Sequence, residues 1–110
     1  MQFDKIVRDK VPDIIREKGG GFSSVQVEDC LAVVYLIKKL REEADEVAEA
    51  NGNDVKMVEE MGDIYECLMA ICDKININFE EVIKASGAKA MTNGGFNKNI
   101  ILLWMSGEKF

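Results

Sequence analysis

Four acidic residues in the middle of the chain are spaced so that they can hold a metal ion. Glu43 and Glu46 lie three residues apart, and so do Glu60 and Asp63. Residues three apart share one face of a helix, so each pair would present two carboxylates together. Like charges this close repel each other by roughly 0.2–0.5 kcal/mol per pair. Such a pair is either part of an ordinary solvated face or is relieved by a bound cation.

The positions of the two pairs favour one shared site. At ~100° per residue, Glu43 and Glu46 lie roughly 80° and 140° from the centre of their apolar stripe, and the second pair has nearly the same offsets. Measured from Gly52 at ~1.5 Å per residue, the pairs lie about 9–13.5 Å and about 12–16.5 Å along their helices. On antiparallel helices both pairs can therefore turn into one groove, although the sequence alone also permits both to face away. Four converging carboxylates form an all-oxygen site that suits Mg²⁺ or Mn²⁺.

The elements that must carry these residues are helices. Apolar residues follow the helical period over about residues 28–50 and again over about 54–75. The turn at 51–53 is short, so the two long helices must pack antiparallel. A short helix over about 12–18 precedes them, and a third long helix begins near residue 78 and ends near 91 or 93.

The remaining segments are too short to assign by periodicity. Residues 22–27 fit either a strand or an extended connector, and the apolar run at 99–105 fits either a strand or a docked extended segment. Nothing in the composition marks a linker or an internal repeat. We therefore predict a single all-α domain over residues 1–110 with a short extended C-terminal segment.

Charge and residue usage exclude several classes of protein. The net charge is −6, and the stretch from Glu28 to Asp63 holds eleven acidic and four basic residues, a net of −7. Nucleic-acid polymers need a basic face, so we predict no such partner. The simplest interpretation of this excess of acidic residues is a solvated helix face. There is no histidine, so the commonest general base and the usual zinc ligand are both missing.

Cysteine number and hydropathy bear on the compartment. The three cysteines are an odd number with no CxxC spacing, which is typical of buried thiols in a reducing compartment. No apolar run approaches the ~18 residues that a membrane span needs. We expect a cytoplasmic protein with no membrane partner.

Three strings of the sequence resemble a known family. Residues 43–63 match the ExxE…ExxD signature of the all-α NTP pyrophosphatase superfamily, which includes MazG-like proteins. The strings KIVRDKVPDII (5–15), KLREEADEV (39–47) and EEMGDIYECL (59–68) are similar to a small MazG-like branch of house-cleaning NTP pyrophosphatases. The Gly-Gly-Phe at 94–96 also fits, and the resemblance covers nearly the whole chain. One departure is Asn93, where the branch usually has an arginine before Gly-Gly-Phe; this puts phosphate binding, substrate choice or activity in question.

The resemblance implies a MazG-like helical bundle with the metal site between two antiparallel helices. It implies that Glu43, Glu46, Glu60 and Asp63 hold Mg²⁺, with Mn²⁺ as a possible substitute. The reaction would cleave a nucleoside triphosphate, with a noncanonical one preferred, between its α and β phosphates. The products would be a nucleoside monophosphate and pyrophosphate. Members of the family work as dimers or higher oligomers.

Individual roles follow from this interpretation. Glu46 is our first candidate for the carboxylate that orients or deprotonates the attacking water. Lys5, Arg8 and Lys10 are candidates for binding the phosphates, and Lys89 is a weaker one; the alternative is an ordinary charged surface. The long helices are apolar over wide faces, so we predict a homodimer or a dimer of dimers.

Other functions remain open from the sequence. The nearest alternative is an enzyme of the same superfamily that acts on phosphoribosyl-ATP or on dUTP. A second class is a non-enzymatic module that binds a nucleotide or a metal, and a third is an acidic helical adaptor without a ligand. Pyrophosphate release in the presence of Mg²⁺ separates the enzymes from the other two classes.

Overall fold

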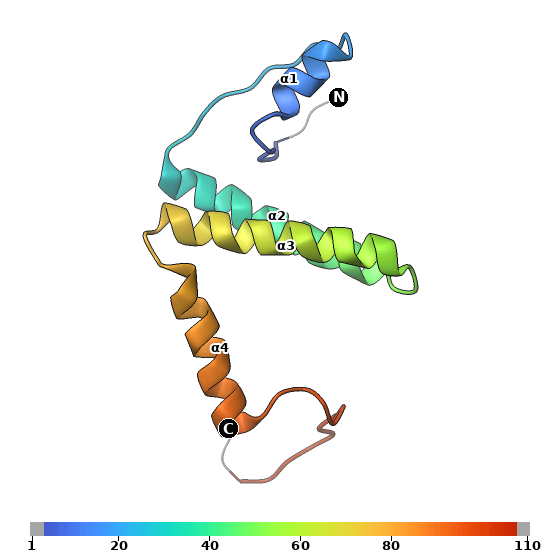
Figure 1. The fold of residues 1–110 in the computed structure, drawn as a ribbon, viewed down its shortest axis with the longest axis vertical. Coiled ribbons are helices and arrows are strands. Elements are labelled where there is room, and N and C mark those ends of the chain that lie inside the picture. Colours follow the sequence, from blue (N-terminus) through green and yellow to red (C-terminus); the bar gives the residue numbers. More distant parts are fainter. Residues whose placement is uncertain (1–3, 108–110) are drawn as a thin grey trace. The chain divides into compact units, whose positions relative to one another are not determined.

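The computed structural model describes residues 4–107 and contains four α-helices over that range. They are α1 (Val11–Glu17), α2 (Asp29–Glu49), α3 (Asp54–Lys74) and α4 (Phe79–Asn93) (Figure 1). The described part of the chain has no strand. The all-α prediction is confirmed, and each helix begins and ends close to its predicted bounds.

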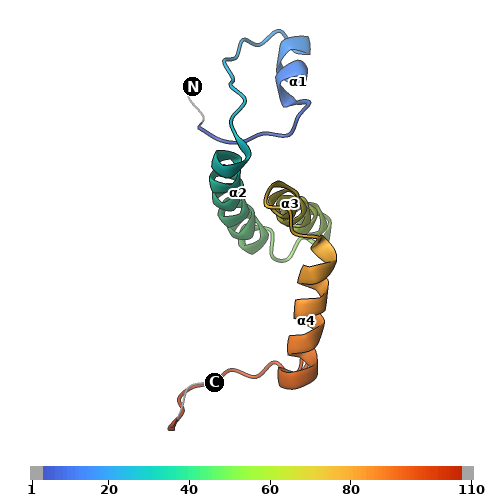
Figure 2. The ribbon, with the colours of Figure 1, turned by 90° about the vertical axis from the view of Figure 1, so that its left-hand side faces the viewer.

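The turn between α2 and α3 sets up the helical hairpin. Gly52 adopts a φ of 97°, in the left-handed region that glycine enters without steric cost. The Asn53 side chain then accepts a hydrogen bond of 3.1 Å from the backbone N–H of Lys56, which caps the first turn of α3. Because only residues 50–53 separate the helices, the chain reverses direction and α3 returns along α2, and the two lie side by side in both views (Figures 1 and 2).

The core of this hairpin is small. Its buried apolar side chains are Ala32 and Leu36 from α2, Cys67 and Cys72 from α3, and Ala50 in the turn. No large side chain of the described residues is fully buried. The prediction of buried thiols is confirmed for two cysteines but is wrong for Cys30, which is exposed in the first turn of α2, where no other element covers it.

The chain divides into two compact units, residues 1–79 and 80–110. The first holds α1 and the α2–α3 hairpin, and the second holds most of α4 and the C-terminal segment. The segments 20–28 and 94–106 form neither helix nor strand, so neither open segment is a strand. The apolar run at 99–105 is not docked either, because its side chains are largely exposed, Leu103 at 87% and Trp104 at 78%. That residues 1–110 are a single domain stays a prediction. Within the described range, no helix combines the length and apolar character needed to cross a membrane.

Candidate metal centre

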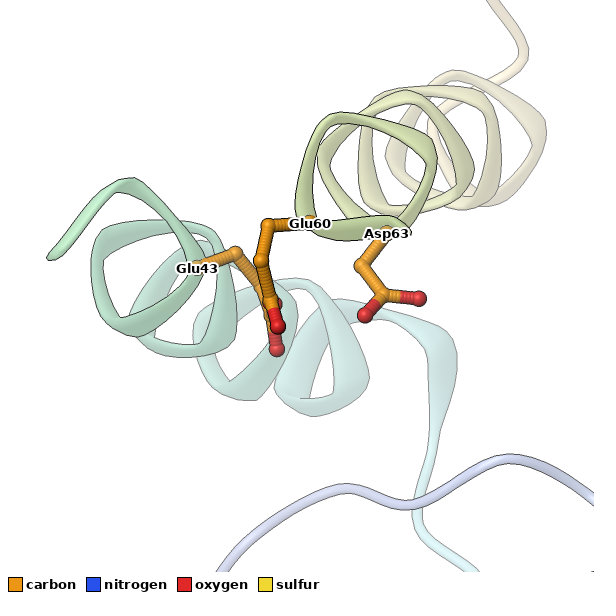
Figure 3. A group of neighbouring side chains, drawn as sticks. All are labelled: Glu43, Glu60 and Asp63. Atoms are coloured by element: carbon orange, nitrogen blue, oxygen red, sulfur yellow. The ribbon is translucent and has the colours of Figure 1, made fainter. Parts of the chain in front are cut away.

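Three of the four predicted carboxylates meet between α2 and α3. One carboxylate oxygen from each of Glu43, Glu60 and Asp63 lies within 4.8 Å of the others (Figure 3). Glu43 and Glu60 are only 8% and 9% exposed, whereas Asp63 is partly exposed. Side chains that carry a charge are rarely this buried without a partner ion. The cluster is therefore not an ordinary solvated helix face.

The helical repeat explains why the two glutamates point inward. Glu43 follows the buried Leu36 by seven residues, and Glu60 precedes the buried Cys67 by seven. Seven residues make almost two full turns, so each glutamate continues the row of core side chains along its own helix. Carboxylates thus occupy positions where the pattern would otherwise place apolar residues.

The electrostatics of this buried pair are unfavourable without a cation. Glu43 Oε2 is buried and has no hydrogen-bond partner, while Glu43 Oε1 lies 3.5 Å from Lys39 Nζ. The hydrogen bond to Glu43 raises the pKa of Glu60 above its ordinary value, and burial and the neighbouring carboxylates raise it further. Two carboxyl groups in contact can share a proton, but a cation would neutralise them better. The unpartnered oxygen is where a bound cation would contact Glu43.

These residues fit a hard divalent cation. Carboxylate oxygens are the preferred ligands of Mg²⁺, which binds them at about 2.0–2.1 Å, so two ligands on opposite sides of the ion are about 4.2 Å apart. The observed spread of up to 4.8 Å therefore needs only small side-chain movements to close around the ion. A donor set of carboxylates alone, with no thiolate or imidazole, favours Mg²⁺ or Mn²⁺ over zinc.

One basic residue of the N-terminal segment reaches this cluster. The Arg8 guanidinium donates to Asp63 Oδ1 at 2.7 Å and lies 2.9 Å from Glu66 Oε2. Lys5 Nζ lies 3.5 Å from Glu42 Oε2, next to Glu43 in sequence. The hydrogen bonds to Asp63 and Glu66 raise the pKa of Arg8, which stays charged. Arg8 therefore lies beside the acidic cluster, whereas Lys5 contacts the neighbouring Glu42.

Comparison with known proteins identifies the family of this chain. Residues 23–89, more than half of the chain, match the family model of phosphoribosyl-ATP pyrophosphohydrolase. The chain belongs to this family. The phosphoribosyl-ATP pyrophosphohydrolase family lies within the MazG-like all-α NTP pyrophosphatase superfamily, so the resemblance noted from the sequence is confirmed. Its members are pyrophosphohydrolases, which act on acid anhydrides. No curated protein and no solved structure matches the chain.

Glu46 stands apart from the other three carboxylates. It is exposed and lines an open pocket of about 390 Å³ together with residues from the α2–α3 turn. Its charge nevertheless contributes to the raised pKa of Glu60. The larger angular offset of Glu46 from the apolar stripe explains why it faces outward while Glu43 faces inward. Its roles as a metal ligand and as the catalytic carboxylate stay predictions.

The structure does not test the other two predicted phosphate-binding residues. Lys10 is exposed immediately before α1, and Lys89 lies on α4 in the second unit. Their substrate roles stay predictions. Sequence reasoning passed over Lys39 and Glu66, which pair with Glu43 and Arg8. Both could have been found from helical spacing, since Lys39 is four residues before Glu43 and Glu66 is three after Asp63.

Proposed function

We propose that this protein catalyses the Mg²⁺-dependent hydrolysis of a nucleoside triphosphate, with a noncanonical one preferred, to a nucleoside monophosphate and pyrophosphate. The observation that carries the proposal is the carboxylate group of Glu43, Glu60 and Asp63 with its buried, unpartnered oxygen. The family match supports a pyrophosphohydrolase acting on a nucleotide. In an acidic adaptor without a ligand these carboxylates would have to share a proton, whereas a metal site uses them as ligands.

Each of the candidate residues has a proposed role in this reaction. Glu43, Glu60 and Asp63 would hold Mg²⁺, with Glu46 as a fourth carboxylate nearby. When bound, Mg²⁺ neutralises phosphate charge and polarises the phosphoryl group that is attacked. Glu46, which is exposed and outside the group of three, is suited to orient the water and accept its proton. Arg8, which contacts Asp63, and Lys5 on the same segment are the proposed phosphate-binding residues, with Lys10 and Lys89 as further candidates.

Phosphoribosyl-ATP is the second candidate substrate, because the matching family model carries that name. The bond broken would be the same anhydride between the α and β phosphates. This substrate has an additional phosphoribosyl group, which needs further cations to bind it. The resemblance to the house-cleaning branch favours a noncanonical nucleoside triphosphate, whereas the family match favours phosphoribosyl-ATP, and turnover of each substrate decides between them.

Product analysis tests the proposal directly. The protein is incubated in the presence of Mg²⁺ with canonical and damaged nucleoside triphosphates, with dUTP and with phosphoribosyl-ATP. The monophosphate and the pyrophosphate are then quantified. We expect equal amounts of monophosphate and pyrophosphate. Orthophosphate with a diphosphate would mean that a different anhydride bond is cleaved. Nucleotide-dependent stabilisation without any turnover would instead assign a non-enzymatic binding module.

We also propose that the protein works as a homodimer or a dimer of dimers in the cytoplasm. Large apolar side chains remain exposed on both long helices, among them Val34 at 60% and Val58 at 66%. The hairpin core is too small to cover them, and a second copy presents the same surface for mutual burial.

A further inference from the structure

The N-terminal segment bridges the two helices that carry the acidic cluster. Its first described residue, Asp4, accepts a hydrogen bond of 3.4 Å from the Tyr35 hydroxyl on α2. Lys5 then reaches Glu42 on the same helix, and Arg8 reaches Asp63 and Glu66 on α3. In Figure 3 the trace of this segment passes on the side toward which the three carboxylates point. The segment therefore spans the cluster from one helix to the other.

Arg8 and a metal ion draw on the same carboxylate. The guanidinium lies 2.7 Å from Asp63 Oδ1, and Asp63 belongs to the group whose oxygens lie within 4.8 Å of one another. Two cations this close to one carboxylate repel each other, so binding of the metal weakens the contact of Arg8 with Asp63. The Arg8 side chain is 53% exposed and free to change its rotamer.

Glu66 gives Arg8 a second partner that the metal does not need. Glu66 lies one turn beyond Asp63 on α3, and its carboxylate lies 2.9 Å from the other terminal nitrogen of Arg8. A guanidinium can hold two acceptors at once because its donors form a planar fork. When Asp63 binds a metal, Glu66 still holds Arg8 at the edge of the site, and the guanidinium nitrogen that had contacted Asp63 is released. The released nitrogen can then donate to an anion.

We propose that Arg8 is an exchangeable cation: it occupies the Asp63 side of the site in the metal-free protein, and metal binding releases it to hold the pyrophosphate end of the substrate. This proposal rests on the proposed function and adds the order of events to it. Arg8 competes with the metal but assists the phosphate. Its removal should therefore shift the two affinities in opposite directions, which a purely structural role would not do.

The test uses Mn²⁺ alone and then inorganic pyrophosphate as probes, with binding measured by calorimetry. For Arg8→Gln we expect about two- to fivefold tighter Mn²⁺ binding, the range expected for the loss of an exposed ion pair. Pyrophosphate should bind the Mn²⁺-loaded variant at least about tenfold more weakly than the parent. Arg8→Lys, which keeps the charge but loses the fork, should fall between Arg8→Gln and the parent for both probes.

Arg16→Gln is the matched control. Arg16 is also exposed and also pairs with a carboxylate, Asp13 at 2.9 Å, but this pair lies within α1. The control should bind both probes as the parent does. Mn²⁺ binding to Arg8→Gln that is unchanged or weaker would overturn the exchange, and so would unchanged pyrophosphate binding. If the parent itself binds no Mn²⁺, the metal site and with it the proposed function fail, which is a separate result.

Discussion

Glu43→Gln is the substitution that most directly probes the buried carboxylate pair. In the metal-free protein it removes one of two adjoining charges and supplies an amide that can donate to Glu60. A buried oxygen without a partner, as Glu43 Oε2 is, costs about 1–3 kcal/mol. The weakened pair with Lys39 offsets about 0.3–0.5 kcal/mol of that gain. We expect the metal-free variant to be more stable by about 1 kcal/mol, which raises Tm by about 4 °C in a chain of this size.

Mg²⁺ should make the parent more stable than the variant. At a concentration of about 100 times its Kd, a ligand stabilises the parent by about 2.7 kcal/mol. If the amide weakens binding about tenfold, the variant gains only about 1.4 kcal/mol under the same conditions. The Tm increase on adding Mg²⁺ should then be about 5 °C smaller in the variant than in the parent. Turnover should fall about 100-fold or more, because the positioned ion contributes several kcal/mol to the transition state.

The assay combines thermal unfolding in chelator and in Mg²⁺ with a pyrophosphate-release measurement. Asp45→Asn is the matched control, because Asp45 lies on the same helix two residues further on, is exposed and is outside the carboxylate group. It loses the same charge without touching the site. If Glu43→Gln and Asp45→Asn have the same stability, metal response and turnover, then Glu43 is not part of a metal site.

Three further predictions concern the mechanism, the pH response and the assembly. If Glu46 orients the attacking water and does not bind the metal, Glu46→Gln should lower turnover by about 100-fold or more and keep most of the Mg²⁺-induced Tm increase. Loss of both the turnover and the Tm increase would make Glu46 a metal ligand. In the presence of a chelator, the Tm of the parent should fall as the pH rises through the raised pKa of Glu60, because the folded state favours the neutral carboxyl. Glu60→Gln should lack this decline, and identical pH profiles of the two proteins would contradict this account. Light scattering at micromolar concentration should give at least twice the mass of one chain, and a monomeric mass would refute the proposed dimer.

Local physics made the helices and part of the site predictable. The apolar period, the glycine and asparagine of the 51–53 turn and the short connection were enough to predict two long antiparallel helices, because each acts over a few neighbouring residues. The same spacing predicted that Glu60 and Asp63 would share a face, and the structure shows them together. The family resemblance rested on contiguous strings and needed no tertiary information.

Long-range packing decided the rest. The larger offset of Glu46 from the apolar stripe already separated it from Glu43, but only the packing of α2 against α3 buried Glu43 and left Glu46 exposed. The contact of Arg8 with Asp63 joins residues 55 positions apart, so no helical period could indicate it. Segment 22–27 remained ambiguous because a strand needs a partner, and the existence of a partner depends on the whole fold. The sequence by itself determined which residues could bind a cation, whereas tertiary packing decided which of them meet, since convergence depends on helix rotation and not on residue type.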